Sequence, residues 1–232
     1  ALQIYAGYGI TTIQDSNLPL DYIEMLRQEA ASEAYPVDMV AYAMANPLSD
    51  EVLDSIEVEQ NYVNGFRLGG IKFTLDGSPQ GRTAWLTEPY EQGPPGAADD
   101  YVAYPSYEPS EYLRRIPAII ERGLPALVHV NGDAAIDLML EGLESIAQQG
   151  PLPDHRSVAI HAQLARPDQL DRMRELGVLP SFYAVHPFFW GDWHRLSFGD
   201  ERASFISPLR AALDRGIPIT IHNDSPVVPP DI

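Results

Sequence analysis

The chain has a single lysine, Lys72, inside the apolar run from Gly69 to Leu75, whereas the other 14 of its 15 basic residues are arginine. An amine can lose its charge, form a Schiff base or take up CO2 as a carbamate, while a guanidinium stays charged. The same position also suits a lysine whose stem packs at a strand end while its ammonium group reaches water. The residues that accompany Lys72 must decide between these interpretations.

Three further polar residues end apolar runs: His129, His161 and Asp224. Taken singly, each histidine could be a core residue bonded to a carbonyl, and Asp224 could cap the turn that follows it. Together with Lys72, they occupy the ends of four separate runs. Two imidazoles and a carboxylate suit Zn²⁺ or a similar divalent cation, and a carbamylated Lys72 would add two oxygens able to bridge two ions. A metal lowers the pKa of bound water, whose proton Asp224 could pass to a leaving group.

Alternating apolar runs and helical segments predict the elements that position these residues. Seven strands joined by helices favour an α/β fold with a parallel sheet, of the (β/α)8 TIM-barrel type but incomplete, in one domain over residues 1–232. Neither a Gly-x-Gly-x-x-Gly nor a P-loop sequence occurs, so nucleotide-binding folds lose support. The expected strands are 10–13, 37–43, 68–75, 126–130, 157–160, 178–183 and 217–221; the expected helices are 20–34, 50–60, 110–122, 134–149, 167–176 and 208–215.

Two long irregular stretches are expected, 76–107 and 184–207, and loops over a barrel mouth often bind substrate. The second is rich in aromatic residues, and His186 and Trp190 are candidates for lining a substrate pocket; they could equally cover the barrel rim. Arg82, in the first stretch, could bind a substrate anion or, as we favour, pair with an acid.

The other polar residues have structural interpretations. We expect Asp133 to cap the helix that begins at Ala134 rather than to orient a ligand histidine. His155 is expected on the solvated surface. His222 lies two residues before Asp224, so it should point to the same side, where we expect it to pack rather than to add a ligand.

Composition limits the function. The 232 residues are 45% hydrophobic with a net charge of −18, which disfavours binding to nucleic acid or anionic membranes. The absence of cysteine excludes disulfides, thiolate metal sites and a cysteine nucleophile. No apolar run reaches the length of a membrane span, and no signal-peptide pattern opens the chain, so the cytoplasm is the expected location.

The order Lys72, His129, His161, Asp224 resembles the amidohydrolase superfamily. Short sequence motifs narrow the resemblance to the YtcJ-like branch, the third amidohydrolase sequence family. These motifs are residues 70–72 with 76–78, 81–84, 129–136, 161–163 and 223–227. This resemblance implies a (β/α)8 barrel that hydrolyses amide-like C–N bonds in small molecules, N-substituted formamides among them. It places Lys72, His129, His161 and Asp224 at metal-ligand positions and makes Asp224 the general base and acid.

Two departures from the family pattern matter. No His-x-His pair occurs, and the family's small β-sandwich is absent, so the chain is expected to be a fragment lacking the first barrel strand and two metal ligands. Open sheet edges would favour a homo-oligomer. Two alternatives stay open: a Schiff-base lyase or aldolase barrel with Lys72 as nucleophile, and a non-catalytic remnant that holds no metal.

Overall fold

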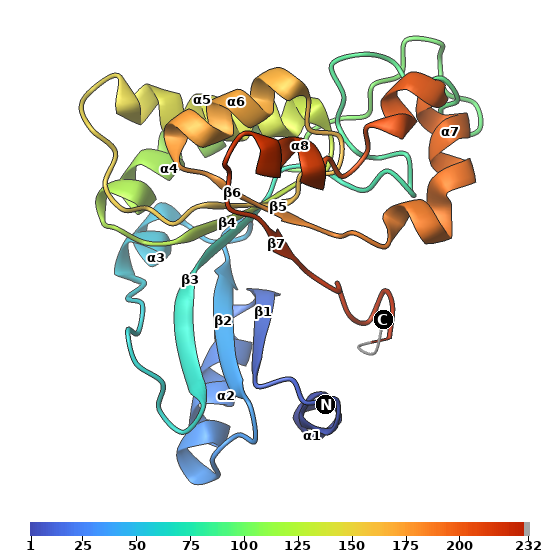
Figure 1. Ribbon diagram of the computed structural model, residues 1–232. Coiled ribbons are helices and arrows are strands. Elements are labelled where there is room, and N and C mark those ends of the chain that lie inside the picture. Colours follow the sequence, from blue (N-terminus) through green and yellow to red (C-terminus); the bar gives the residue numbers. More distant parts are fainter. Residues whose placement is uncertain (230–232) are drawn as a thin grey trace.

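The computed structural model describes residues 1–229, in which seven parallel strands form one sheet in chain order. The sheet curls into part of a barrel, open between β1 and β7 in the described residues (Figure 1). The prediction of an incomplete α/β barrel is confirmed.

The strands are β1 (Thr12–Leu18), β2 (Asp38–Met44), β3 (Phe66–Thr74), β4 (Ala126–Val130), β5 (Val158–His161), β6 (Leu179–Phe182) and β7 (Thr220–Ile221). The helices are α1 (Leu2–Gly7), α2 (Leu20–Ser32), α3 (Asp50–Ser55), α4 (Pro109–Glu121), α5 (Asp133–Ala147), α6 (Pro167–Leu176), α7 (His186–Ser204) and α8 (Leu209–Asp214).

Strand alternation explains which polar side chains face the inside of the curl. Ile71 and Phe73 on β3 belong to the main core, and the ring of Phe73 meets Tyr112 of α4 edge-on at 5.2 Å between ring centres. Because successive side chains of a strand point to opposite faces, Lys72 faces away from the helices. On β4, Val128 and Val130 join the same core, which directs His129 to the inner face in the same way.

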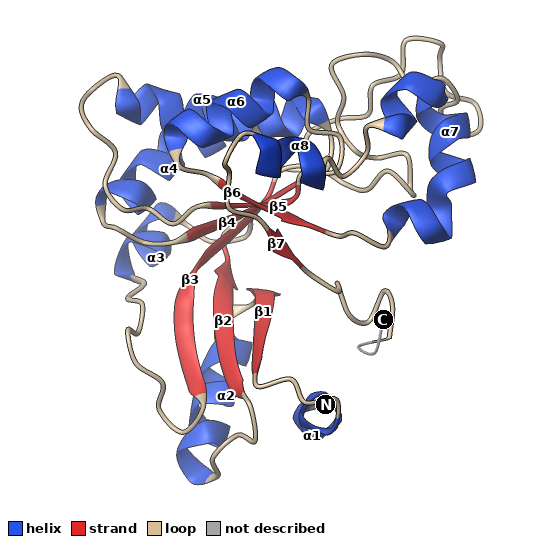
Figure 2. Ribbon diagram, viewed as in Figure 1, coloured by secondary structure: helices blue, strands red, loops and turns tan. Residues whose placement is uncertain are grey.

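The core lies between the sheet and its covering helices. Figure 2 shows α4, α5 and α6 side by side over β3 to β6, and these helices contact one another in that order. Helix α5 is apolar on most of its surface because it is packed on several sides at once. Its fully buried residues are Ala135, Ile136, Met139 and Leu140.

Gly70 sets the spacing of the strands that carry the site. A Cβ at this position would lie 2.2 Å from the carbonyl oxygen of Pro125, just before β4, and 2.8 Å from the ring of Tyr42 on β2. Only glycine therefore fits between the two neighbouring strands here. The parallel register pairs Thr74 with His129, which brings the carboxyl ends of β3 and β4 together.

The stretch 184–207 is not irregular as predicted but contains helix α7. Its backbone departs from helical angles at Trp190 and at Gly199, where φ is 76°. These interruptions break the apolar period, so the sequence lacked the pattern by which a helix is identified. Phe198 of α7 packs on Ala84, Leu86 and Tyr90 of the irregular segment 76–107, so helix and segment cover each other.

Several other expectations are corrected. Helix α1 was not predicted, and β1 runs to Leu18 instead of ending at Ile13. Its second half is polar because this strand lies at the edge of the sheet and is largely exposed. His155 is buried, not solvated: its Nε2 lies 2.9 Å from the carbonyl oxygen of Leu176, and its Nδ1 accepts the backbone N–H of Ser157 at 3.1 Å.

Among residues 1–229, no helix combines the length and the apolar character that crossing a bilayer requires.

Candidate metal centre

The carboxyl ends of the strands bring three donor side chains together. One nitrogen each of His161 and His222 and one carboxylate oxygen of Asp224 lie within 4.8 Å of one another. The His129 ring lies beside His161, 4.6 Å between ring centres. Lys72 of β3 completes the group, since its ammonium acts electrostatically on Asp224 and His129. The four predicted residues thus share one location.

His222 was expected to pack, yet it is part of the donor group. Its Nε2 lies 3.2 Å from Nδ1 of His161, and its Nδ1 lies 2.9 Å from the hydroxyl of Ser181. Two nitrogens bound to one tetrahedral Zn²⁺ at about 2.0–2.1 Å lie about 3.3 Å apart. The observed spacing fits a shared ion. The sequence did carry a signal, because His222 alternates with Asp224 along the same segment.

Hydrogen bonds at Nε2 orient the ring of His129. Its Nε2–H donates to the carbonyl oxygen of Gly77 at 2.9 Å, and the same oxygen accepts Nδ2 of Asn131 at 2.8 Å. A proton on Nε2 leaves the lone pair of Nδ1 free for a cation. The segment after β3 therefore fixes the tautomer of His129.

Asp76 holds this segment in place, and sequence reasoning missed it. The carboxylate is buried and accepts the backbone N–H groups of Trp85, Asn131 and Gly132 at 3.1, 2.9 and 2.7 Å. Burial raises the pKa of Asp76 to about 7, against the lowering effect of these three donors. The sequence feature that could have identified Asp76 is its position directly after the apolar strand that ends near Leu75.

Two residues of the donor group have left-handed backbone conformations. The φ angles are 73° at His161, 44° at the following Ala162 and 58° at Asp224. Residues with a Cβ rarely adopt such angles, and they do so most often at functional sites, where the surrounding structure enforces them. The fold thus directs both side chains at a cost in backbone strain.

Burial keeps the imidazoles uncharged. It lowers the pKa of His129 and of His222 to about 4, and that of His161 well below its ordinary value. Burial also lowers the pKa of Lys72 to about 7, although Asp224 opposes the shift. Neutral imidazoles have lone pairs for a metal, and a carboxylate with two or three imidazoles is a donor set that divalent transition metals prefer. The residues present therefore fit a divalent cation.

The two aromatic candidates lie beside this centre. The His186 ring is 6.4 Å from that of His161 and 4.2 Å from that of Tyr183 between ring centres. Trp190 follows, 5.9 Å from His186. Both come from the first part of α7, the helix that follows β6 and lies beyond the carboxyl ends of β5 and β6 in Figure 1.

Arg82 has a different environment from the one expected. Its guanidinium donates to Ser197 at 3.1 Å, to the carbonyl oxygen of Gly93 at 2.6 Å and to Gln92 at 3.1 Å, and it stacks 4.1 Å from the ring of Trp193. Within residues 1–229 these partners are uncharged, so the favoured pairing with an acid is wrong. The side chain is buried and ties α7 to the segment 76–107.

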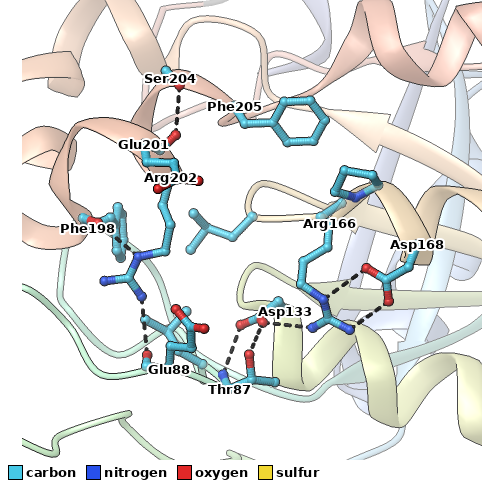
Figure 3. A pocket seen from close by; sticks show the side chains of 14 residues that line it. Thr87, Glu88, Asp133, Arg166, Asp168, Phe198, Glu201, Arg202, Ser204 and Phe205 are labelled. Carbon is cyan, nitrogen blue, oxygen red and sulfur yellow. Dashed lines mark hydrogen bonds and ion pairs between the residues drawn. The ribbon is translucent and has the colours of Figure 1, made fainter.

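A separate cavity of about 480 Å³ lies between the segment 86–88, the start of α6 and the end of α7, away from the donor group. Figure 3 shows Arg166 between Asp133 and Asp168, with Nη1 of Arg166 2.8 Å from Asp133. Asp133 also accepts the backbone N–H of Thr87 at 3.0 Å. Gly132, not Asp133, is the N-cap of α5, so the predicted capping role is wrong. These pairs join the segment 86–88 to the start of α5, and α5 to Arg166 at the start of α6.

Comparison with known proteins agrees with this geometry. Residues 1–231 match the Amidohydrolase family. The chain belongs to this family. It is 22% identical over 230 residues to the N-substituted formamide deformylase of Arthrobacter pascens, which covers 96% of this chain and 41% of the relative. It is 25% identical over 166 residues to the putative amidohydrolase YtcJ of Bacillus subtilis, and this match covers 70% of this chain and 29% of YtcJ.

This amidohydrolase chain also resembles solved structures. An uncharacterized metal-dependent hydrolase from Pyrococcus furiosus superposes with a TM-score of 0.81 at 25% identity, over 99% of this chain and 46% of the other. The chain thus spans less than half the length of the curated relatives and of this structure. The resemblance that the sequence suggested is confirmed at the level of family and fold.

Proposed function

We propose that the protein is a metal-dependent hydrolase of amide-like C–N bonds in small molecules. The donor group at the strand ends carries the proposal, because His161, His222 and Asp224 converge within 4.8 Å on the inner face of an amidohydrolase barrel. A relative that is a formamide deformylase supports formamides and related amides as the substrate class.

His161, His222 and Asp224 would hold the cation, with His129 and a carbamylated Lys72 as further ligands. We propose zinc, as one or two ions, because nitrogen and carboxylate donors suit it. When bound, such an ion polarises the carbonyl group of the substrate and lowers the pKa of a water molecule.

The chain supplies proton transfer and positioning. The carboxylate of Asp224 accepts a proton as the attacking water forms the C–O bond, and it then returns that proton to the leaving nitrogen as the C–N bond breaks. His186 lies beside His161 and Trp190 lies beside His186, and both would contact the substrate. Arg82 holds α7 in place, and a substrate anion could reach it only if its present partners were exchanged.

Metal content and hydrolysis test the proposal together. We expect stoichiometric zinc, manganese or iron by elemental analysis, and a native-mass adduct of one CO2 that disappears in Lys72→Ala. Hydrolysis of N-formyl and N-acyl amides should stop with a chelator, and Asp224→Asn should lower kcat by about 10²-fold or more. Asp99→Asn, at an exposed position, is the control. Activity unaffected by chelator would contradict the proposal, and a chain with neither metal nor activity would leave the remnant interpretation.

Borohydride trapping separates the hydrolase from a Schiff-base enzyme. A lyase or aldolase with Lys72 as nucleophile would be fixed irreversibly to a carbonyl substrate by borohydride. We expect no adduct on Lys72, because family membership and the converging histidines favour a metal ligand. An adduct at this residue would contradict the assigned role of Lys72.

We also propose that copies of the chain associate. β1 and β7 are the two edges of the sheet, and neither has a further strand beside it in residues 1–229. Unpaired edges favour pairing with another chain. Sedimentation at several concentrations should give a mass above 25.7 kDa, the mass of one chain. A monomer at every concentration would contradict this proposal.

A further inference from the structure

A row of buried polar atoms runs from the candidate metal centre into α7, and only His186 among them has a role in the proposed function. The atoms are the Tyr183 hydroxyl, His186 Nδ1, His194 Nδ1 and Gln163 Oε1, and none has a hydrogen-bond partner within residues 1–229. His194 is 1% exposed and Gln163 0%. Since buried polar groups are normally paired, several unpaired ones in a single region are positions where a bound ligand or a water molecule would supply the missing partners.

The row is continuous with the metal centre. The ring of His186 lies 6.4 Å from that of His161 and 6.0 Å from that of His194, between ring centres. Nε2 of His194 then lies 3.4 Å from the amide nitrogen of Gln163. The unpaired atoms of His194 and Gln163 are thus connected to the metal centre through His186.

The hydrogen-bonding pattern defines the free groups. Nε2 of His194 faces two amide nitrogens, of Gln80 at 3.5 Å and of Gln163 at 3.4 Å. Amide NH2 groups only donate, so Nε2 accepts and the neutral ring carries its proton on Nδ1. The region then offers a donor at His194 Nδ1 and an acceptor at Gln163 Oε1, both unpaired.

Within residues 1–229, neither His186 nor His194 offers a positive charge to an ionic ligand near pH 7. Burial lowers the pKa of His194 to about 4, so the ring is neutral near pH 7. Arg82 lies on the same side but donates to Ser197, Gly93 and Gln92. Aromatic rings flank the two histidines, with Trp190 5.9 Å from His186 and Phe198 6.0 Å from His194.

We propose that Gln163 and His194 form a subsite that selects substrates with an uncharged polar group, such as a carboxamide, beyond the scissile bond. The N–H of that group donates to Gln163 Oε1, and its carbonyl oxygen accepts Nδ1–H of His194. A carboxylate in the same place has no N–H for Gln163 Oε1, so two acceptors would face each other in a buried site and the carboxylate is rejected. This inference rests on the proposed function and names its substrate class.

Two probes with the same scissile bond test the subsite: N-formylglycinamide and N-formylglycine. Binding to the metal-loaded chain is measured by NMR titration, and hydrolysis is measured separately by formate release. The wild type should prefer the amide. Gln163→Leu and His194→Phe, on different elements, should each weaken amide binding about fivefold to tenfold, the loss of one neutral hydrogen bond, and leave carboxylate binding unchanged.

Gln169→Leu is the matched control, because Gln169 is equally buried but has both partners: it accepts Arg166 N–H at 3.0 Å and donates to the carbonyl oxygen of Asp133 at 2.7 Å. It should lower the melting temperature and leave the preference intact, whereas Gln163→Leu should change the melting temperature little. Unchanged amide affinity in both subsite variants, or equal losses for both probes, would overturn the subsite. Binding with the expected preference but no hydrolysis would instead contradict the proposed function.

Discussion

At the scale of single residues, the site depends on how each donor atom is held. His222 illustrates this, since the hydroxyl of Ser181 occupies its Nδ1 at 2.9 Å and leaves Nε2 directed at His161, 3.2 Å away. Its ring also stacks on that of Tyr183 at an interplanar angle of 19°. A side chain fixed on three sides is ready to bind a metal without further ordering.

His222→Ala should therefore weaken zinc binding by at least about tenfold, because the loss of a ligand exceeds the effect of losing a supporting hydrogen bond. Isothermal titration with zinc measures this. His155→Gln removes an imidazole whose hydrogen-bond partners within residues 1–229 are Leu176 and Ser157, and it should leave the affinity unchanged. Equal affinity of His222→Ala and the wild type would remove His222 from the ligand set.

Asp76→Ala should destabilise the protein by about 3 kcal/mol or more, because three backbone N–H groups, two buried and one partly buried, lose their acceptor. Urea unfolding measures the change in free energy. Asp99→Ala, an exposed position in the segment 76–107, should change it by less than about 0.5 kcal/mol. If both variants unfolded at the same urea concentration, Asp76 would not have the structural role assigned here.

At the scale of elements, the packing of β2, β3 and β4 determines where Lys72 and His129 lie. These strands approach closely because Gly70 faces the Pro125 carbonyl oxygen and the Tyr42 ring. Helix α7 then covers the segment 76–107, and buried Arg82 joins the two. The inner site is thus built on strands, while its surroundings depend on contacts between a helix and a segment without regular structure.

Gly70→Ala should lower the free energy of unfolding by about 2 kcal/mol or more, because the new Cβ would lie 2.2 Å from a backbone oxygen that cannot move independently. It should also weaken zinc binding, since β3 must shift relative to β4. Gly150→Ala is the control, because a Cβ there has nothing within 4 Å. Urea unfolding and zinc titration of both variants check the prediction. An unchanged stability of Gly70→Ala would show that the strands separate freely.

At the scale of the whole molecule, charge and topology dominate. The net charge is −18, and several of the ion pairs join two exposed side chains, where each pair contributes little. Repulsion among the excess carboxylates therefore opposes the compact state. The open curl of seven strands adds two sheet edges to this acidic surface.

Salt should consequently stabilise the fold. Raising NaCl from about 0.02 M to about 0.2 M shortens the screening length below about 10 Å and should raise the melting temperature by a few degrees. Calorimetry at constant pH checks this, and sodium sulfate at equal ionic strength separates screening from ion exclusion. A melting temperature that falls with NaCl would mean that attractive ion pairs outweigh the net repulsion.

The sequence by itself determined the strand order, the parallel sheet, the family resemblance and the four residues at the strand ends. Each follows from local patterns: apolar runs mark buried strands, and polar residues at their ends mark the site. His222, Asp76 and helix α7 depended on the tertiary structure. Whether His222 packs or binds depends on Ser181 and His161, which are 41 and 61 residues away. Asp76 finds its three donors across the chain, and α7 is helical because the segment 76–107 covers its apolar residues. Contacts between distant segments decided these features, and no local spacing records them.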